Sequence, residues 1–277
     1  MDKKILAIIG DPISHSLSPT LHNYWFNKYK IDAKYKLLNI KETEIKDIVD
    51  KIKNGDLYGI NITLPYKQKI IPFVSKMIND SEESNSVNTI YLNKDKQLIG
   101  ENTDVYGFQA AYLSKITDSE SKNYKILIMG SGGVTPSIIV ALRRLKLNNI
   151  SVTNRTYEKS LLLKKKFPNL KLIKWNEKDK YTDEFDIIVN ATSLGLKNGP
   201  DFDTLIQNYK KSLIYIDTIY NPLDTKMIKH FKKNNIKTYN GLDMFVYQGQ
   251  KSFYLWHKIK PEINNNLIEL LKSKIND

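Results

Sequence analysis

The chain has 277 residues, of which 41% are hydrophobic and 26% charged, enough for one large globular domain or two of ordinary size. No apolar run approaches the roughly 18 residues of a membrane span, and the absence of cysteine excludes disulfides and thiolate chemistry. The net charge is +13, but the lysines are scattered rather than gathered in a stripe, so we expect no nucleic-acid partner. The positive field would still attract anionic small molecules.

Neither the histidines nor the amino terminus suggests a special site. The four histidines show no metal-binding spacing, so no metal site is expected. The apolar stretch at 5–10 is too short for an export signal and predicts a buried strand, and we expect a cytoplasmic protein without a membrane partner.

In the first half, strand-like and helix-like patterns alternate, as in α/β proteins. We predict strands at 4–10, 35–40 and 58–65, helices at 19–29, 42–54 and 104–116, and a hairpin at 89–100 with its turn at 93–96. Ser18, just before Pro19, is expected to cap the first helix.

A polar stretch at 117–124 precedes the second series of elements. Predicted strands follow at 125–130, 150–154, 171–175, 186–192, 213–218 and 236–240, with helical patterns between most of them, and the chain ends with helices at 243–256 and 264–273. This order predicts two α/β domains, one formed by 1–103 with 241–277 and a Rossmann-type doubly wound one at 104–240.

The segment KILIMGSGGVTPSIIVALRRL, which begins at Lys125, reads as a strand, a glycine turn and a helix. Gly130, Gly132 and Gly133, with Ser131 between them, would let a pyrophosphate approach the backbone at the helix start. The third glycine of the usual fingerprint is replaced by Thr135. The context nevertheless predicts a dinucleotide site rather than an ordinary tight turn.

The end of the next strand distinguishes NADP from NAD. An NAD site would carry an acidic residue there to bind the ribose hydroxyl. The chain instead has Asn154, Arg155, Thr156 and Lys159. Cationic groups attract a 2′-phosphate, so the expected cofactor is NADP.

Polar residues in the first half are less easily explained by folding alone. Asn61 and Thr63 share one face of a predicted strand, with Lys67 just beyond it. Taken alone, this segment is interpreted as an ordinary strand with one face exposed to solvent. Ser14 and Ser16 lie in the loop after the first strand and could bind a carboxylate, and Asn88, Asn102 and Asp104 lie close to predicted turns.

Nine motifs together resemble the shikimate dehydrogenase family in order and spacing. They extend from residue 10 to residue 248 and read GDPISHSLSPTLHN (10–23), NITLPYK (61–67), SVNT (86–89), GENTDVYGF (100–108), GSGG (130–133), NRT (154–156), NATSLG (190–195), DTIYNP (217–222) and GLDMFVYQ (241–248). The resemblance implies NADP-dependent interconversion of 3-dehydroshikimate and shikimate, a step toward chorismate and the aromatic amino acids. The first domain would bind substrate and the second NADP.

The resemblance also implies roles for single residues. Lys67 and Asp104 match the catalytic pair. The substrate would be bound by Ser14 and Ser16 at its carboxylate and by Asn61, Thr63, Asn88, Asp104 and Gln248 at its hydroxyls, with Tyr220 closing the pocket. The cofactor would contact Gly130, Ser131, Gly132, Gly133, Asn154, Arg155, Thr156, Lys159, Thr192, Ser193, Gly241 and Met244.

Several alternatives stay open at this stage. Oxidation of a secondary alcohol needs a proton acceptor near its oxygen and a hydride acceptor at its carbon, and Lys67 could serve as a true acid–base or as a fixed hydrogen-bond donor. The same site could take quinate, with NAD or NADP, and a non-catalytic NADP sensor is a third reading. The sequence is compatible with a monomer or a homodimer.

Overall fold

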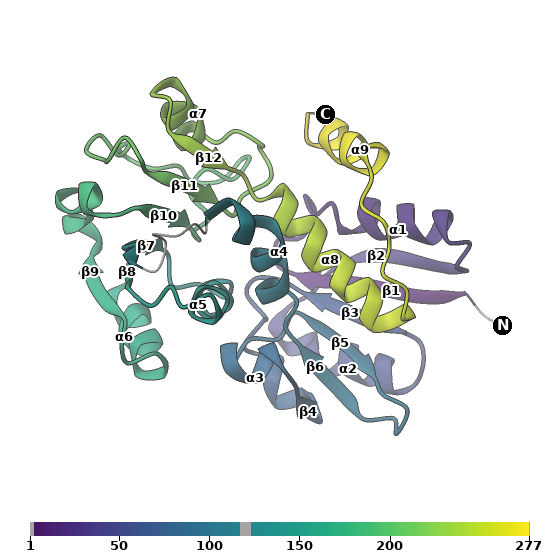
Figure 1. Cartoon of the computed structure of the whole chain (residues 1–277). Helices are drawn as coiled ribbons and strands as arrows, with labels where there is room; N and C mark the ends of the chain where they lie inside the picture. The colour runs from purple at the N-terminus through teal and green to yellow at the C-terminus, as the bar shows by residue number, and fades with distance from the viewer. Residues whose placement is uncertain (1–2, 117–122, 277) are drawn as a thin grey trace. The chain divides into compact units, whose positions relative to one another are not determined.

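A computed structural model describes residues 3–116 and 123–276. Apart from single residues at the carboxyl terminus, the chain divides into two compact units (Figure 1). Unit 1 comprises Met1–Gly107 and Val246–Ile275, and unit 2 comprises Phe108–Phe245. The polar stretch predicted at 117–124 lies, except for its last two residues, outside the described residues.

Unit 1 contains a mixed sheet with the strand order β2-β1-β3-β5-β6-β4. Its strands are β1 (Lys4–Gly10), β2 (Ala33–Asn39), β3 (Gly59–Ile62), β4 (Lys76–Met77), β5 (Thr89–Leu92) and β6 (Leu98–Glu101). β1 is parallel to β2 and β3, whereas β5 is antiparallel to both β3 and β6. The ends of β1, β3 and β6 and the start of β5 therefore meet at one edge of the sheet.

Helices cover both faces of this sheet. They are α1 (Ser18–Lys28), α2 (Ile45–Lys53), α3 (Asp80–Ser84), α8 (Leu242–His257) and α9 (Asn265–Asn276), and α4 (Asp104–Ile116) begins in this unit. Side chains of a strand alternate between faces, so Ile60 and Ile62 pack in the core that contains α2, while Asn61 points the other way and bonds to Ser252 of α8.

The face toward α1 and α8 is filled by aromatic rings. His22 is fully buried and stacks on Tyr35 with ring centroids 4.4 Å apart. Burial, with a smaller contribution from His257, lowers the pKa of His22 to about 3. The imidazole is therefore neutral at physiological pH and belongs to the core.

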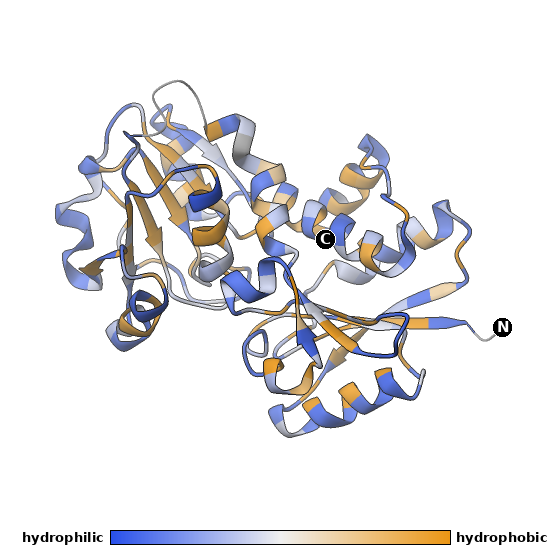
Figure 2. Ribbon diagram, turned by 60° about the horizontal axis from the view of Figure 1, so that its bottom comes forward, coloured by the Kyte–Doolittle hydropathy of each residue, from blue (hydrophilic) through white to orange (hydrophobic). Residues whose placement is uncertain are grey.

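Unit 2 is built on a wholly parallel sheet with the order β12-β11-β10-β7-β8-β9. Its elements are β7 (Ile126–Met129), α5 (Thr135–Arg144), β8 (Ile150–Asn154), α6 (Tyr157–Lys166), β9 (Lys171–Lys174), β10 (Ile187–Asn190), β11 (Ile214–Asp217), α7 (Lys226–Lys233) and β12 (Lys237–Tyr239). The four central strands, β7, β8, β10 and β11, form the hydrophobic interior of the unit (Figure 2). The strand order reverses between β7 and β10, the place where doubly wound folds bind ligands.

The predicted fold class is confirmed, and the predicted helices and strands occur with small shifts at their ends. The strand predicted at 58–65 stops at Ile62, because the chain turns at Thr63, whose carbonyl accepts the Tyr66 N–H. The cap predicted at Ser18 is wrong: Ser18 is already in the helix, and its N–H donates to the hydroxyl of Ser16.

Candidate functional site

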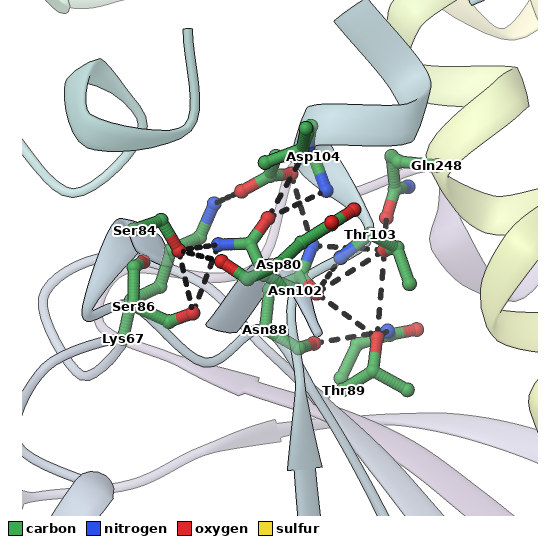
Figure 3. A network of polar contacts seen from close by, with 12 residues as sticks. Lys67, Asp80, Ser84, Ser86, Asn88, Thr89, Asn102, Thr103, Asp104 and Gln248 are labelled. Atoms are coloured by element: carbon green, nitrogen blue, oxygen red, sulfur yellow. Dashed lines mark hydrogen bonds and ion pairs between the residues drawn. The ribbon is translucent and has the colours of Figure 1, made fainter. Parts of the chain in front are cut away.

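The polar residues predicted in the first half of the chain lie where strand ends of unit 1 meet. Lys67 follows β3, Asn88 directly precedes β5, and Asp104 starts α4 just after β6. The antiparallel pairing of β3 with β5 and of β5 with β6 brings these ends together. Residues separated by up to 37 positions thereby become hydrogen-bond neighbours (Figure 3).

Lys67 and Asp104 form a buried ion pair. Lys67 Nζ lies 2.6 Å from Asp104 Oδ2, and the two side chains are only 11% and 7% exposed. A buried pair of this kind is held by its own attraction and by further hydrogen bonds that offset the loss of hydration. The structure therefore places a cation and a carboxylate together as the motif pattern predicted.

Asn88 provides the further hydrogen bond to Asp104. Its Nδ2 donates to Asp104 Oδ1 at 2.9 Å. The orientation of the amide is fixed, because the Thr103 backbone N–H donates to Asn88 Oδ1 at 2.8 Å and only an oxygen can accept it. Asp104 is consequently held as an acceptor at both oxygens, by an amide on one side and by the Lys67 ammonium on the other.

A cluster of hydroxyl groups lies behind Asn88. Thr89, Thr103 and Ser252 are all fully buried. The Ser252 hydroxyl lies 2.9 Å from that of Thr89 and 3.2 Å from that of Thr103, and both threonines also donate to Asn88 Oδ1. None of the three was identified as a site residue from the sequence. They are 14 to 163 positions apart, so no local sequence motif contains them together.

Asn61 and Gln248 reach this cluster in different ways. The Asn61 amide nitrogen has three acceptors, at Asn88, Thr89 and Ser252, and its oxygen accepts from Tyr35. Its side chain is thus engaged within the protein. Gln248, on α8, accepts a long 3.4 Å hydrogen bond from Thr103 and is only partly buried.

The remaining predicted substrate residues of unit 1 lie in the loops after β1 and β3. Ser14 is exposed, and Ser16 and Thr63 are half-buried. The two loops are joined by hydrogen bonds from the Thr63 N–H to the Ile9 carbonyl and from the Asp11 N–H to the Leu64 carbonyl. The three hydroxyls are therefore carried by two loops that are held side by side.

In unit 2, the glycine turn follows β7 at the switch point of the sheet. Gly130 has a φ of +112°, and a Cβ there would lie 2.7 Å from the Ala191 carbonyl oxygen. A Cβ at Gly132 would instead meet nothing within 4 Å. Thr135, in place of the third glycine, donates its hydroxyl to the Gly130 carbonyl and closes the turn. The open space at Gly132, beside the amino terminus of α5, fits a pyrophosphate.

The residues predicted to meet the adenosine phosphate lie between β8 and the start of α6. Asn154 accepts the Ser131 N–H at 3.0 Å and donates to the Thr156 carbonyl at 2.7 Å, so it ties the glycine turn to this segment. Arg155, Thr156 and Lys159 are exposed. Among the described residues, neither Arg155 nor Lys159 has an ion-pair partner, so both cations are available to a phosphate.

The other predicted cofactor residues occupy the loop after β10 and the start of α8, and Tyr220, which was predicted as a substrate residue, lies in the loop after β11. Thr192 is half-buried and Ser193 exposed. Tyr220 stacks on Phe245, with centroids 4.5 Å apart, and Met244 is buried. At Gly241 a Cβ would lie 2.1 Å from the Thr218 carbonyl oxygen, so only glycine allows these segments to approach so closely.

Together these features describe two chemical sites. Unit 1 holds a lysine–carboxylate pair among hydrogen-bond donors, an arrangement suited to proton transfer at an oxygen atom of a polar ligand. Unit 2 holds a dinucleotide cradle with free cations where a 2′-phosphate would lie. No helix within the described ranges is long and apolar enough to cross a membrane.

Comparison with known proteins agrees with this division. Sequence models of three families match: the shikimate dehydrogenase substrate binding domain at residues 8–90, shikimate / quinate 5-dehydrogenase at 112–242, and the shikimate 5′-dehydrogenase C-terminal domain at 241–264. Shikimate dehydrogenase (NADP(+)) of Pelagibacter ubique is 46% identical over 97% of this chain and 99% of its own.

Solved structures are similar over nearly the whole chain. The crystal structure of shikimate dehydrogenase from Aquifex aeolicus has a TM-score of 0.85 at 31% identity and covers 99% of this chain and 98% of its own. A shikimate dehydrogenase solved in complex with NADP+ has a TM-score of 0.83 at 30% identity and covers 99% and 95%.

Proposed function

Because the chain belongs to the shikimate dehydrogenase family, we propose that it catalyses the reversible NADP-dependent interconversion of 3-dehydroshikimate and shikimate. The reaction is an oxidation of a secondary alcohol in one direction and a reduction of a ketone in the other. Its place is in the biosynthesis of chorismate and the aromatic amino acids.

The observation that carries the proposal is the buried pair of Lys67 and Asp104 with Asn88 beside it. A non-catalytic NADP-binding protein would have no need of a buried ion pair, which costs hydration and adds little to the free energy of unfolding. Lys67 is proposed as the residue that donates a proton to the ketone oxygen and accepts it in reverse. Asp104 holds the ammonium in place and accepts from a neighbouring substrate hydroxyl.

The substrate residues proposed around this pair are those that offer hydrogen bonds at the same edge of the sheet. Ser14 and Ser16 would bind the ring carboxylate, and Thr63, Asn88 and Gln248 would bind its hydroxyls. Asn61, which the motif match also gives as a substrate residue, donates to the Asn88 carbonyl and to the Thr89 hydroxyl, so we propose that it also orders the site around those two residues. Tyr220, in the segment after β11, is proposed as a further substrate residue because it belongs to a matched motif.

The NADP residues proposed are those of unit 2. Gly130, Ser131, Gly132 and Gly133 would receive the pyrophosphate. Asn154, Arg155, Thr156 and Lys159 would receive the adenosine phosphate, and Thr192, Ser193, Gly241 and Met244 would lie along the rest of the cofactor. When bound, the nicotinamide supplies or accepts the hydride. The protein's own task is to bind, to orient and to move one proton at Lys67 Nζ.

The proposal is tested by following absorbance at 340 nm with the purified chain. We expect NADPH formation from shikimate and NADP+, with a far lower kcat/KM when quinate replaces shikimate or NAD+ replaces NADP+. Turnover of quinate or NAD+ at equal efficiency would favour the quinate/shikimate alternative. NADP+ binding without turnover would favour a non-catalytic sensor. DNA binding that weakens steeply with rising salt concentration, again without turnover, would favour a nucleic-acid-binding protein.

Gln248→Ala is expected to raise the KM for shikimate by about three- to tenfold with a smaller effect on kcat, as loss of one hydrogen bond predicts. Steady-state kinetics measure the split. Lys251→Ala, three positions further along α8, is the matched control and should leave both constants near the parent values. An unaltered KM in Gln248→Ala would remove this residue from the substrate site.

A further inference from the structure

Unit 2 contains a buried carboxylate that the proposed chemistry does not use. Asp217, the last residue of β11, is 0% exposed. Within the described part of the chain, no lysine or arginine pairs with it. Its partners are four hydrogen-bond donors, at Asn190 Nδ2, the Ile219 N–H, the Thr225 hydroxyl and the Tyr215 hydroxyl, at distances of 3.0, 3.0, 2.9 and 3.3 Å.

The first of these donors shapes the loop that follows β10. Asn190 Oδ1 accepts both the N–H and the hydroxyl of Thr192, so its amide nitrogen must point away from them. That nitrogen donates to Asp217 Oδ1 and to the Leu194 carbonyl. The path of residues 191–195, which carry Thr192 and Ser193 and pack against Gly130, therefore depends on an acceptor at position 217.

The second donor fixes the segment after β11. The Ile219 N–H donates to Asp217, and the Ile219 carbonyl accepts the N–H of Gly241 at 2.8 Å. The Thr218 N–H in turn donates to the Asn190 carbonyl at 3.0 Å. One carboxylate thus joins the loop after β10, the segment leading to Tyr220, and Gly241 at the start of α8.

We propose that Asp217 is a positioning residue of the NADP site, whose carboxylate holds the 191–195 loop and the 218–220 segment where Thr192, Ser193 and Gly241 can meet the cofactor. The inference rests on the proposed function for the identity of the cofactor. It assigns Asp217 no contact with NADP and no chemical step.

The electrostatics support a role beyond stability. Burial raises the pKa of Asp217 to about 6, even though its four hydrogen bonds act in the opposite direction. Keeping a carboxylate without a cation in this interior therefore costs free energy, and a neutral side chain would be cheaper for folding alone. A carboxylate can only accept hydrogen bonds, and it does so at both oxygens. It therefore suits the four donors that surround Asp217.

Two substitutions at this position separate geometry from charge. Asp217→Asn keeps an oxygen toward Asn190 and Ile219 and turns an amide nitrogen toward two hydroxyls, which can accept as well as donate. Asp217→Ala removes every acceptor. We expect the dissociation constant of NADP+ to rise about tenfold or more in the alanine variant and less than about threefold in the asparagine variant. The shikimate KM should rise less than the NADP+ dissociation constant in both, because Tyr220 is the one proposed substrate residue that lies on the loosened segments.

The readouts are NADP+ titration of the cofactor-free protein, steady-state kinetics, and amide hydrogen exchange. Exchange at residues 191–195 and 218–220 should accelerate in Asp217→Ala, while β7 stays protected. Thr182→Ala, which removes a fully buried residue's hydroxyl and its hydrogen bond to the Asn208 carbonyl in unit 2, is the control for general destabilisation and should leave NADP+ affinity unchanged. Should Asp217→Ala not fold, Asn190→Ala cuts the same link from the loop side and should weaken NADP+ similarly.

Unchanged NADP+ affinity and loop exchange in a folded variant would overturn the inference, as would an equal loss of NADP+ and shikimate binding. Failure of the proposed function looks different, since the parent protein itself would then not oxidise shikimate. The exchange measurement would still report in that case whether Asp217 holds the two segments.

Discussion

Lys67→Ala is expected to lower kcat by about a hundredfold or more while the KM for shikimate changes little, because proton transfer by a positioned group contributes about 10²–10⁴ to rate. The ammonium of Lys67 is 2.6 Å from Asp104 and nearly buried, and no other cation in the described part of unit 1 pairs with this carboxylate. The measurement is steady-state kinetics in both directions at saturating NADP+ or NADPH.

The control for this substitution lies two residues away. Lys69 is exposed and pairs with Glu42 on the surface. The Lys69→Ala variant should therefore keep a kcat near that of the parent enzyme. Removing one partner of a buried pair also destabilises a protein, by about 3–5 kcal/mol, so thermal unfolding must show that Lys67→Ala is folded under assay conditions. Asp104→Asn, which preserves the shape, provides a second test. A folded Lys67→Ala enzyme with ordinary kcat would eliminate the lysine from the mechanism.

The double change Asn154→Asp with Arg155→Ala is expected to shift the preference from NADP toward NAD. An aspartate at 154 can still accept the Ser131 N–H, so the glycine turn should keep its path, although the donor to the Thr156 carbonyl is lost. Hydrogen bonds to charged groups are worth about 1.5–3 kcal/mol each. The double variant loses the hydrogen bond from Arg155 to the phosphate and gains a negatively charged aspartate at position 154. Together these changes should reduce the NADP/NAD ratio of kcat/KM by roughly a hundredfold.

The matched control is Lys165→Ala, near the other end of α6, which removes one positive charge far from the helix start. It should leave the cofactor ratio unchanged. If the double variant kept the parent ratio, Asn154 and Arg155 would not be the residues that recognise the 2′-phosphate.

Much of the architecture could be predicted from the sequence, because its signals are local. The parallel strands of unit 2 are short runs of apolar residues with helical patterns between most of them, and the glycine turn lies between β7 and α5 as predicted. The hairpin at 89–100 forms as β5 and β6. Strand order follows from general rules of doubly wound sheets once these elements are recognised.

The supporting parts of both sites could not be predicted, because their partners are distant in sequence. Ser252 reaches Thr89 across 163 positions, and Asn190 reaches Asp217 across 27. Serine and threonine are common in loops and strands, so nothing in the local pattern marks those that are buried together. The short helix α3 was missed for a related reason, since five polar residues carry no amphipathic period.

The discontinuity of unit 1 has a consequence for synthesis on the ribosome. The indole of Trp256 packs against Gly59 and donates to the Ile90 carbonyl, so the sheet is finished by a residue made nearly two hundred codons after β3. At about 5–20 residues per second that interval lasts roughly 10–40 s. All of unit 2 is synthesised within that interval, so the aromatic core of unit 1 stays incomplete in the nascent chain until α8 has been made.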